Sequence, residues 1–104
     1  MAFYTFKQNN SGGSFDVDEN VCHAVIIEAL NMEHACARAE NIGIYFNGVE
    51  DGMDCSCCGD RWSVPWDEGS DTPMIYGEPA SEYKSSWTTP SVIIHYADGR
   101  KESF

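Results

Sequence analysis

The run VCHAVIIEAL, residues Val21–Leu30, constrains the fold more than any other stretch of the chain. Apolar residues follow one another in it with few interruptions, whereas a strand with one face in water alternates apolar and polar residues. A nearly continuous apolar run of this length is typical of a strand that is covered on both faces. We therefore expect a central strand over Val21–Leu30.

A helix is predicted directly after this strand. Asn31 is a good N-cap, and Glu33 lies in the first turn, where a carboxylate interacts favourably with the helix dipole. Apolar and small residues then recur at helical spacing, at Met32, Ala35, Cys36, Ala39 and Ile42. Gly43 suits the C-terminal end of the helix. The small side chains on this face predict close packing on a sheet, with Cys36 as a core residue.

The remaining strands are predicted from shorter patterns. Segments with the composition of strands are Ala2–Gln8, Ile44–Phe46, Met74–Tyr76, Ser91–Tyr96 and Arg100–Phe104. Asp98-Gly99 is a strong signal for a two-residue turn, so the last two segments should form a hairpin. Val21–Phe46 has the order of a βαβ-like unit. We predict one α+β domain over residues 1–104, with a mostly antiparallel sheet of about four to five strands and one helix packed on it.

The charge of the chain narrows the classes of partner. It has 17 acidic residues against 6 lysines and arginines, which gives a formal net charge of −11. This field repels nucleic acid and anionic membranes and favours a basic protein surface. We expect no direct nucleic-acid binding and no membrane association, while a homo-oligomer stays open. The sequence shows neither a bilayer-spanning apolar run nor a signal-peptide pattern, so we expect a cytoplasmic protein.

The stretch DCSCCGDRW, Asp54–Trp62, holds three of the chain's five cysteines. Cys55 and Cys58 form a C-x-x-C followed by glycine, which is the shape of a zinc knuckle. Structural zinc needs four ligands, and the sequence has no second C-x-x-C. The further ligands would come from Cys22, His23, His34, Cys57 or His95. Two alternatives stay open: a redox pair, which the surrounding acids disfavour, and a compact turn with packed cysteines.

The end of the same stretch and a polar loop near the N-terminus supply candidate ligand-binding residues. Arg61 can bind a carboxylate or phosphate through two hydrogen bonds, and Trp62 beside it can stack on a ring. The polar loop offers main-chain N–H groups and amides to an anion or to the edge of a nucleobase. The predicted site comprises Asn9, Asn10, Ser11, Gly12, Gly13, Asp60, Arg61 and Trp62. The alternatives are an ordinary turn and a local Asp60–Arg61 pair beside a half-buried tryptophan.

The motifs FKQNNSGGSF, AENIGIYFNGV and DCSCCGDRW, in this order, resemble a family of small uncharacterised proteins encoded by tailed bacteriophages. The resemblance covers Phe3 to Trp66. It implies the cytoplasm of an infected host cell as the setting, and it implies no activity. No nucleophile–base or paired-acid motif stands out in the sequence, so we expect no enzyme and assign no catalytic residue.

These observations predict a non-enzymatic accessory protein that counters host defence or host machinery. The mechanism we expect is sequestration of a small nucleotide-like ligand at the two polar loops. One alternative is an acidic inhibitor or nucleic-acid mimic that occludes a basic surface of a host protein. The other is an interaction domain stabilised by a zinc knuckle, zinc being the cofactor that the sequence leaves open.

Overall fold

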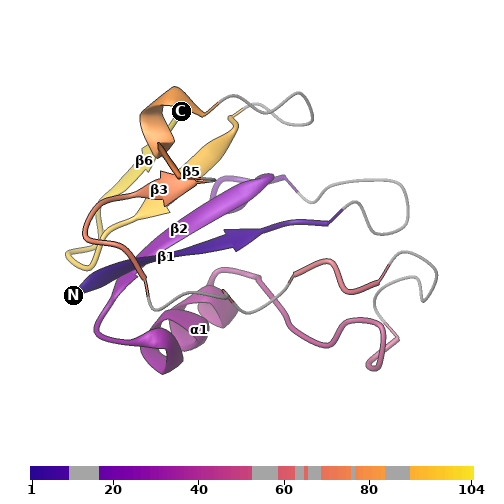
Figure 1. The fold of residues 1–104 in the computed structure, drawn as a ribbon. Coiled ribbons are helices and arrows are strands. Elements are labelled where there is room, and N and C mark those ends of the chain that lie inside the picture. Colours follow the sequence, from indigo (N-terminus) through magenta and orange to yellow (C-terminus); the bar gives the residue numbers. More distant parts are fainter. Residues whose placement is uncertain (10–16, 53–58, 63–64, 66–68, 76, 84–89) are drawn as a thin grey trace.

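The computed structural model describes residues 1–9, 17–52, 59–62, 65, 69–75, 77–83 and 90–104. In these residues the chain forms a four-stranded sheet, an α-helix and a separate two-stranded sheet (Figure 1). The main sheet contains β1 (Ala2–Lys7), β2 (Ala24–Ala29), β5 (Val92–His95) and β6 (Lys101–Ser103). The other elements are α1 (Met32–Asn41), β3 (Met74–Ile75), β4 (Glu78–Pro79) and the 3-10 helix η2 (Ala80–Glu82). The predicted α+β class with a mostly antiparallel sheet is confirmed.

The main sheet has the strand order β1-β2-β5-β6. β1 pairs with β2 and β5 pairs with β6 in antiparallel fashion, whereas β2 and β5 run parallel, with Ala24 opposite Val92. The prediction of a central strand within Val21–Leu30 is therefore confirmed. Parallel pairing of β2 with β5 requires a long crossover, and α1 lies in that crossover.

The predicted strand at Ile44–Phe46 is wrong, and with it the βαβ-like unit over Val21–Phe46. The main chain there closes the end of α1: the N–H of Gly43 donates to the oxygen of Glu40, and the N–H of Ile44 donates to the oxygen of Ala39. An N–H that completes a helix end is not available to a strand ladder. Ile44, only 2% exposed, instead fills the core beneath the helix.

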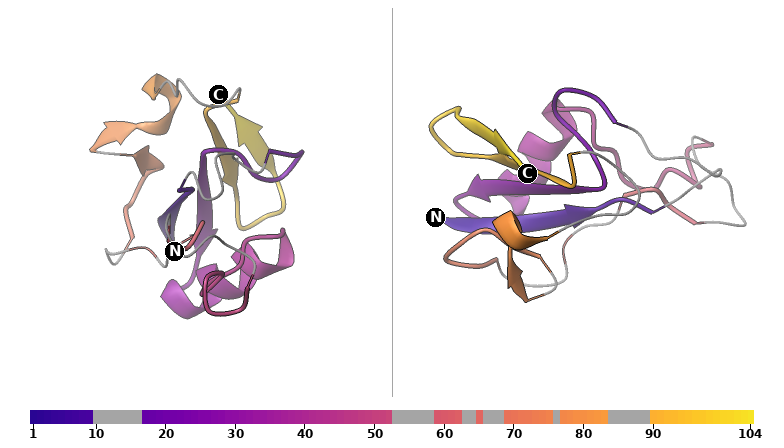
Figure 2. Two further views of the ribbon diagram at one scale, coloured as in Figure 1. Left: turned by 90° about the vertical axis from the view of Figure 1, so that its right-hand side faces the viewer. Right: turned by 90° about the horizontal axis from the view of Figure 1, so that it is seen from above.

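Both faces of the main sheet are covered, as the apolar run in β2 predicts. Val25 and Ile27 face the helix side, where they join Phe6 and Ala35 in one buried cluster. Ile26 points to the opposite face, into a second cluster under β3, β4 and η2. Figure 2 shows these short elements on the side of β1 and β2 that lies away from α1. The sheet therefore forms the middle layer of the described part of the chain.

The predicted ends of the helix and the predicted hairpin are confirmed, but the two-residue turn is wrong. β5 and β6 pair His95 with Lys101, and the N–H of Tyr96 donates to the oxygen of Arg100, so the turn between them has three residues, Ala97–Gly99. Asn31 caps α1, its side-chain oxygen accepting from the N–H of His34 at 2.8 Å. Gly43 adopts a φ of +104° directly after the helix, and Gly99 a φ of +93° in the turn between β5 and β6. Both values lie in the left-handed region that favours glycine. Cys36 is half-buried against the helix-side cluster, and burial raises the pKa of its thiol.

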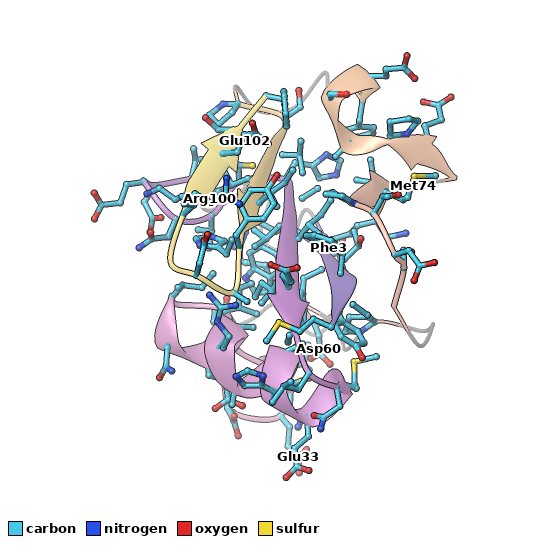
Figure 3. The ribbon with its side chains drawn as sticks, turned by 90° about the vertical axis from the view of Figure 1, so that its left-hand side faces the viewer. Phe3, Glu33, Asp60, Met74, Arg100 and Glu102 are labelled. Atoms are coloured by element: carbon cyan, nitrogen blue, oxygen red, sulfur yellow. The ribbon has the colours of Figure 1, made fainter. Side chains whose placement is uncertain are left out.

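The outer face of α1 is acidic. Glu33 and Glu40 are both exposed there, and Figure 3 shows Glu33 projecting away from the sheet.

Among the described residues, no helix has the length and apolar character needed to cross a lipid bilayer.

Candidate functional site

The two stretches that the sequence singles out for ligand binding meet at the end of β1. Residues 59–62 run beside that end, and Gln8 and Trp62 form an antiparallel bridge. Just beyond it, the main-chain N–H of Asn9 donates to the main-chain oxygen of Arg61 at 2.7 Å. The side-chain amide of Asn9 donates to the main-chain oxygen of Asp60 at 3.2 Å. The predicted site residues Asn10, Ser11, Gly12 and Gly13 lie outside the described residues. Asn9 and Asp60–Trp62 are thus brought together.

Arg61 is buried at this junction, with 9% of its surface exposed. Its Nη1 donates to Oε1 of Gln8 at 2.9 Å, and its Nε donates to the hydroxyl of Tyr45 at 3.1 Å. Gln8 is itself buried, and its amide nitrogen donates to the oxygen of Cys22 at 2.9 Å. The guanidinium therefore connects the end of β1 with the segment that follows α1, and Gln8 extends this connection to the approach to β2.

Trp62 lies in the core rather than half-buried at the surface. Only 1% of it is exposed, and it belongs to the helix-side cluster with Tyr4 and Phe6. Its indole Nε1 has no hydrogen-bond acceptor within the part of the chain that the structure describes. In this arrangement the indole ring cannot stack on a ligand without leaving the core.

Asp60 supports the junction from its other side. Its Oδ1 accepts a hydrogen bond from the main-chain N–H of Val49 at 2.9 Å. Gly59 precedes it with a φ of +86°, a conformation that glycine adopts without strain. Asn9 and Asp60 are the described members of the predicted site that remain in contact with solvent.

The zinc-knuckle cysteines Cys55 and Cys58 lie outside the described residues, as does Cys57, so the knuckle stays a prediction. Within the described ranges, no group of three or more histidine, cysteine, aspartate or glutamate side chains is placed to hold a metal ion. Cys22 is fully buried, and its thiol donates a hydrogen bond to the main-chain oxygen of Ala24 at 3.2 Å. The Nδ1 of His34 accepts from the N–H of Leu30 at 3.1 Å.

The other two histidines, His23 and His95, each form a hydrogen bond of their own, one at each end of the parallel pair of β2 and β5. The Nδ1 of His23 lies 3.0 Å from the hydroxyl of Tyr83, and the Nε2 of His95 lies 2.8 Å from the oxygen of Asn20. Burial lowers the pKa of both rings, and Lys7 lowers the pKa of His23 further. Both imidazoles are therefore neutral near pH 7.

A family model for a domain of unknown function, DUF7296, matches residues 1–104. The chain belongs to this family. The match runs through the whole chain, well past the Phe3–Trp66 range of the phage resemblance, and it supports membership of a small uncharacterised family. No curated protein and no solved structure matches the DUF7296 chain.

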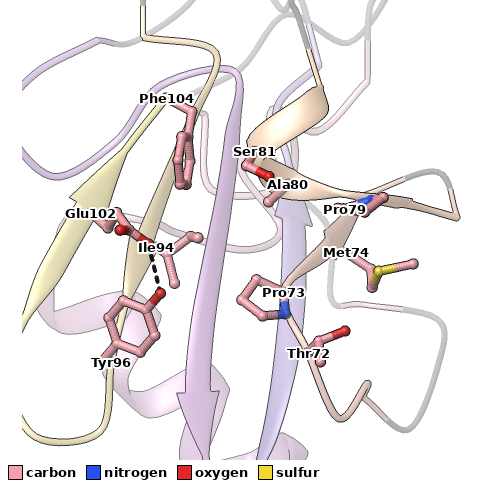
Figure 4. Close-up of a pocket in the computed structure, with 10 residues that line it drawn as sticks. All are labelled: Thr72, Pro73, Met74, Pro79, Ala80, Ser81, Ile94, Tyr96, Glu102 and Phe104. Atoms are coloured by element: carbon pink, nitrogen blue, oxygen red, sulfur yellow. Dashed lines mark hydrogen bonds between the residues drawn. The ribbon is translucent and has the colours of Figure 1, made fainter.

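The DUF7296 fold also has a pocket that the sequence did not reveal, on the sheet face away from α1 (Figure 4). It has a volume of about 340 Å³. Its lining residues are Thr72, Pro73, Met74, Pro79, Ala80, Ser81, Ile94, Tyr96, Glu102 and Phe104. In the observed register Ile94 pairs with Glu102 on one face, whereas the predicted two-residue turn at Asp98-Gly99 pairs Ile94 with Ser103, so the sequence did not place this wall. The opposite wall comes from a segment without strand periodicity, where no sequence signal points to the pocket.

Proposed function

We propose that this DUF7296 protein is a non-enzymatic binding protein whose acidic surface occupies a basic site on a partner protein. The proposal rests on the contacts that the arginine and lysine side chains make within the protein. Arg61 is buried, Arg100 pairs with Asp98 at 2.7 Å, and Lys101 donates to the main-chain oxygen of Glu19 at 2.7 Å. Arg38 donates to the main-chain oxygens of Glu28 and Tyr96. Arg61 is thus withdrawn from the surface, and each of the other three cations is held by a neighbouring residue of the chain, although Arg100 and Lys101 are exposed.

Carboxylates, in contrast, face the solvent on both outer layers. The exposed acids of the described chain include Glu33 and Glu40 on α1, and Asp71, Glu78 and Glu82 around β3, β4 and η2. With a formal net charge of −11, this surface attracts a basic partner over a distance of about 8–10 Å at physiological salt. Charge complementarity of this kind raises the association rate and selects the partner.

The same features favour a protein partner over a nucleotide. Phosphate groups are repelled by the acidic field, and Arg61, the residue best suited to bind them, is engaged with Gln8 and Tyr45. The resemblance of the motifs to tailed-phage proteins supplies the setting of the proposal. The partner is then a protein of the bacterial host, and occupation of its basic site in the host cytoplasm blocks a defence or housekeeping function.

The proposal is tested by capture followed by a salt series. The tagged protein retains proteins from a bacterial extract at about 50 mM NaCl, and the principal one is identified, purified and titrated. We expect a basic partner whose Kd weakens by about tenfold or more between roughly 50 and 300 mM NaCl. Absence of any retained protein, or a Kd that does not depend on salt, would reject occlusion.

Two matched double variants then locate the docking face. Glu33→Lys with Glu40→Lys reverses charge on α1, and Glu78→Lys with Glu82→Lys reverses it on the opposite layer, with the same change in net charge. We expect one pair to weaken binding much more than the other. Binding that neither pair weakens would contradict an electrostatic interface on either layer.

A nucleotide-like ligand at the loop junction is the second candidate, because Asn9 and Asp60 do meet there. Native mass spectrometry of the purified protein would show a co-purified nucleotide directly. Asn9→Ala alters the exposed part of the junction and leaves the bonds of Arg61 to Gln8 and Tyr45 in place. Loss of a bound nucleotide in this variant, with an unchanged melting temperature, would support the site; retention would reject it.

A further inference from the structure

The pocket on the second face of the sheet has the size and lining of a small-molecule site. Ile94 and Ala80 line it from opposite sides and are each 2% exposed, and Phe104 and Met74 are half-buried. Figure 4 shows the β5–β6 hairpin and the segment Thr72–Ser81 facing each other across it. A volume of about 340 Å³ lies within the range of roughly 300–1,000 Å³ that is usual for ligand pockets.

The single charged side chain in the described lining is that of Glu102, which is exposed at the edge of the pocket. The hydroxyl of Tyr96 donates to its Oε1 at 2.7 Å, and this hydrogen bond raises the pKa of the Tyr96 phenol. No donor from the described residues reaches the second oxygen, Oε2. The carboxylate is therefore fixed in orientation by a neighbour and still able to accept a hydrogen bond.

Tyr96 is itself held in place from two sides. Its ring meets that of Phe3 edge-on, with ring centroids 5.9 Å apart. The guanidinium of Arg100 lies 4.7 Å from the Tyr96 ring centroid and is paired with Asp98. Arg100 thus steadies the tyrosine. It also attracts Glu102 electrostatically, but among the described residues its ion pair is with Asp98 and it forms no hydrogen bond with the Glu102 carboxylate.

We infer that this pocket binds a small organic cation, an ammonium group attached to an apolar ring or branched chain. The apolar body would lie between Ile94 and Met74, and the ammonium would donate to Oε2 of Glu102 in a charge-assisted hydrogen bond. An anionic ligand is opposed both by Glu102 and by the net charge of −11. A neutral apolar ligand would cover the carboxylate without pairing it, which costs free energy. The inference goes beyond the proposed function, because it needs no protein partner.

The inference is tested with a pair of probes of similar size and opposite charge, phenethylammonium and hydrocinnamate. Each is titrated into the isotopically labelled protein, and amide chemical shifts report both the location and the Kd of binding. We expect the cation to shift the amides of β5, β6 and residues 72–81, with a Kd about tenfold lower than that of the anion. Equal affinities, or shifts confined to other parts of the molecule, would overturn the inference.

Variants separate the carboxylate from the overall charge. Glu102→Gln keeps the shape of the side chain and should raise the Kd of phenethylammonium by about tenfold. Glu82→Gln makes the same change in net charge at an exposed position that does not line the pocket, and its Kd should stay within about twofold of the unaltered protein. Equal effects of the two changes would show that only the overall field acts and would overturn the assignment.

A third variant tests the cavity itself. Ser81 lies exposed at the mouth of the pocket, so Ser81→Phe fills the entrance without replacing a core residue. A dispersed amide spectrum confirms that this variant is folded. The shifts caused by phenethylammonium should then be lost, and their persistence at the same residues would place the ligand outside the pocket.

Discussion

Arg61 joins three parts of the chain through one guanidinium group. Its partners Gln8 and Tyr45 are neutral, and they come from the end of β1 and from the segment after α1. A buried donor of this kind stabilises the fold chiefly because its acceptors would otherwise lose a hydrogen bond without gaining water. Nothing in the letters DRW distinguishes this role from ligand binding, because the distinction lies in burial, which the short motif does not encode.

Replacement of Arg61 by Met tests this role. The substitution keeps an apolar stem and removes both hydrogen bonds, so the free energy of unfolding should fall by about 2–4 kcal/mol. Tyr45→Phe removes only one of the bonds and should cost about 1 kcal/mol. Urea denaturation measures both changes, and a double-mutant cycle should show that they do not add. A change below about 0.5 kcal/mol for Arg61→Met would contradict the structural role.

His95 gives the fold a dependence on pH. Burial lowers the pKa of its ring from the ordinary value of 6.5; the hydrogen bond to Asn20 opposes this, and Lys101 and Arg38 add to the lowering. The unfolded chain therefore binds a proton at a higher pH than the folded chain does. The free energy of unfolding should decrease as the pH falls below about 6.5.

Urea denaturation at pH values of about 7.5, 6.5 and 5.5 measures this decrease. His95→Gln removes the titrating group and should flatten part of the slope. His23→Gln is the matched comparison, because the pKa of His23 is lowered in the same direction, by burial first and then by Lys7. A slope that neither substitution reduces would contradict the assignment to these histidines.

At the scale of elements, the strands and the helix with local signals were predictable. The apolar run of β2, the cap at Asn31 and the hairpin signal at Asp98-Gly99 each act over a few residues. The strand, the cap and the hairpin are confirmed, whereas the turn has three residues instead of the predicted two. The parallel pairing of β2 with β5 was not predictable, because it depends on contacts between residues far apart in the chain. The same reason applies to the candidate site, since its two stretches meet through contacts between residues about 50 positions apart, such as the bridge between Gln8 and Trp62 and the hydrogen bond from Asn9 to Asp60.

The outer edge of β1 depends on a glycine. Ser70 exchanges two main-chain hydrogen bonds with Phe3, and Gly69 beside it has a φ of +95°. A Cβ on Gly69 would lie 2.8 Å from the Cβ of Ala2 and 3.1 Å from the Tyr4 ring. Gly69→Ala should therefore lower the free energy of unfolding by about 2–4 kcal/mol, through both the backbone conformation and the clash.

Gly77→Ala is the matched control for this prediction. Gly77 also has a positive φ, +77°, but no atom lies within 4 Å of its added Cβ. Only the backbone strain remains, so the cost should be about 1 kcal/mol. Thermal melting of the two variants side by side measures the difference, and equal losses would show that Gly69 does not approach β1 closely.

At the scale of the whole molecule, the acidic side chains lie on the two outer layers, with the sheet between them. The amount of charge could be read from the sequence, but its distribution could not, because the uses of Arg38, Arg61 and Lys101 depend on the fold. Exposed carboxylates that repel one another destabilise the folded state, and salt screens that repulsion.

The melting temperature should therefore rise by several degrees between about 20 and 300 mM NaCl. The double variant Glu33→Gln with Glu40→Gln removes two charges from the outer face of α1 and should show a smaller rise. Differential scanning calorimetry across the salt series provides the measurement. A melting temperature that is independent of salt would mean that self-repulsion contributes little to the stability of this fold.

The pairing of Ala24 with Val92 also determines when the sheet can be completed during synthesis. A ribosome adds about 5–20 residues per second, so β2 emerges seconds before β5 does. During that interval the apolar edge of β2 has no partner strand and can pair with another chain. Folding that must wait for distant contacts is also slow in the free chain. Nascent chains of this protein should therefore need protection from association until β5 has left the ribosome.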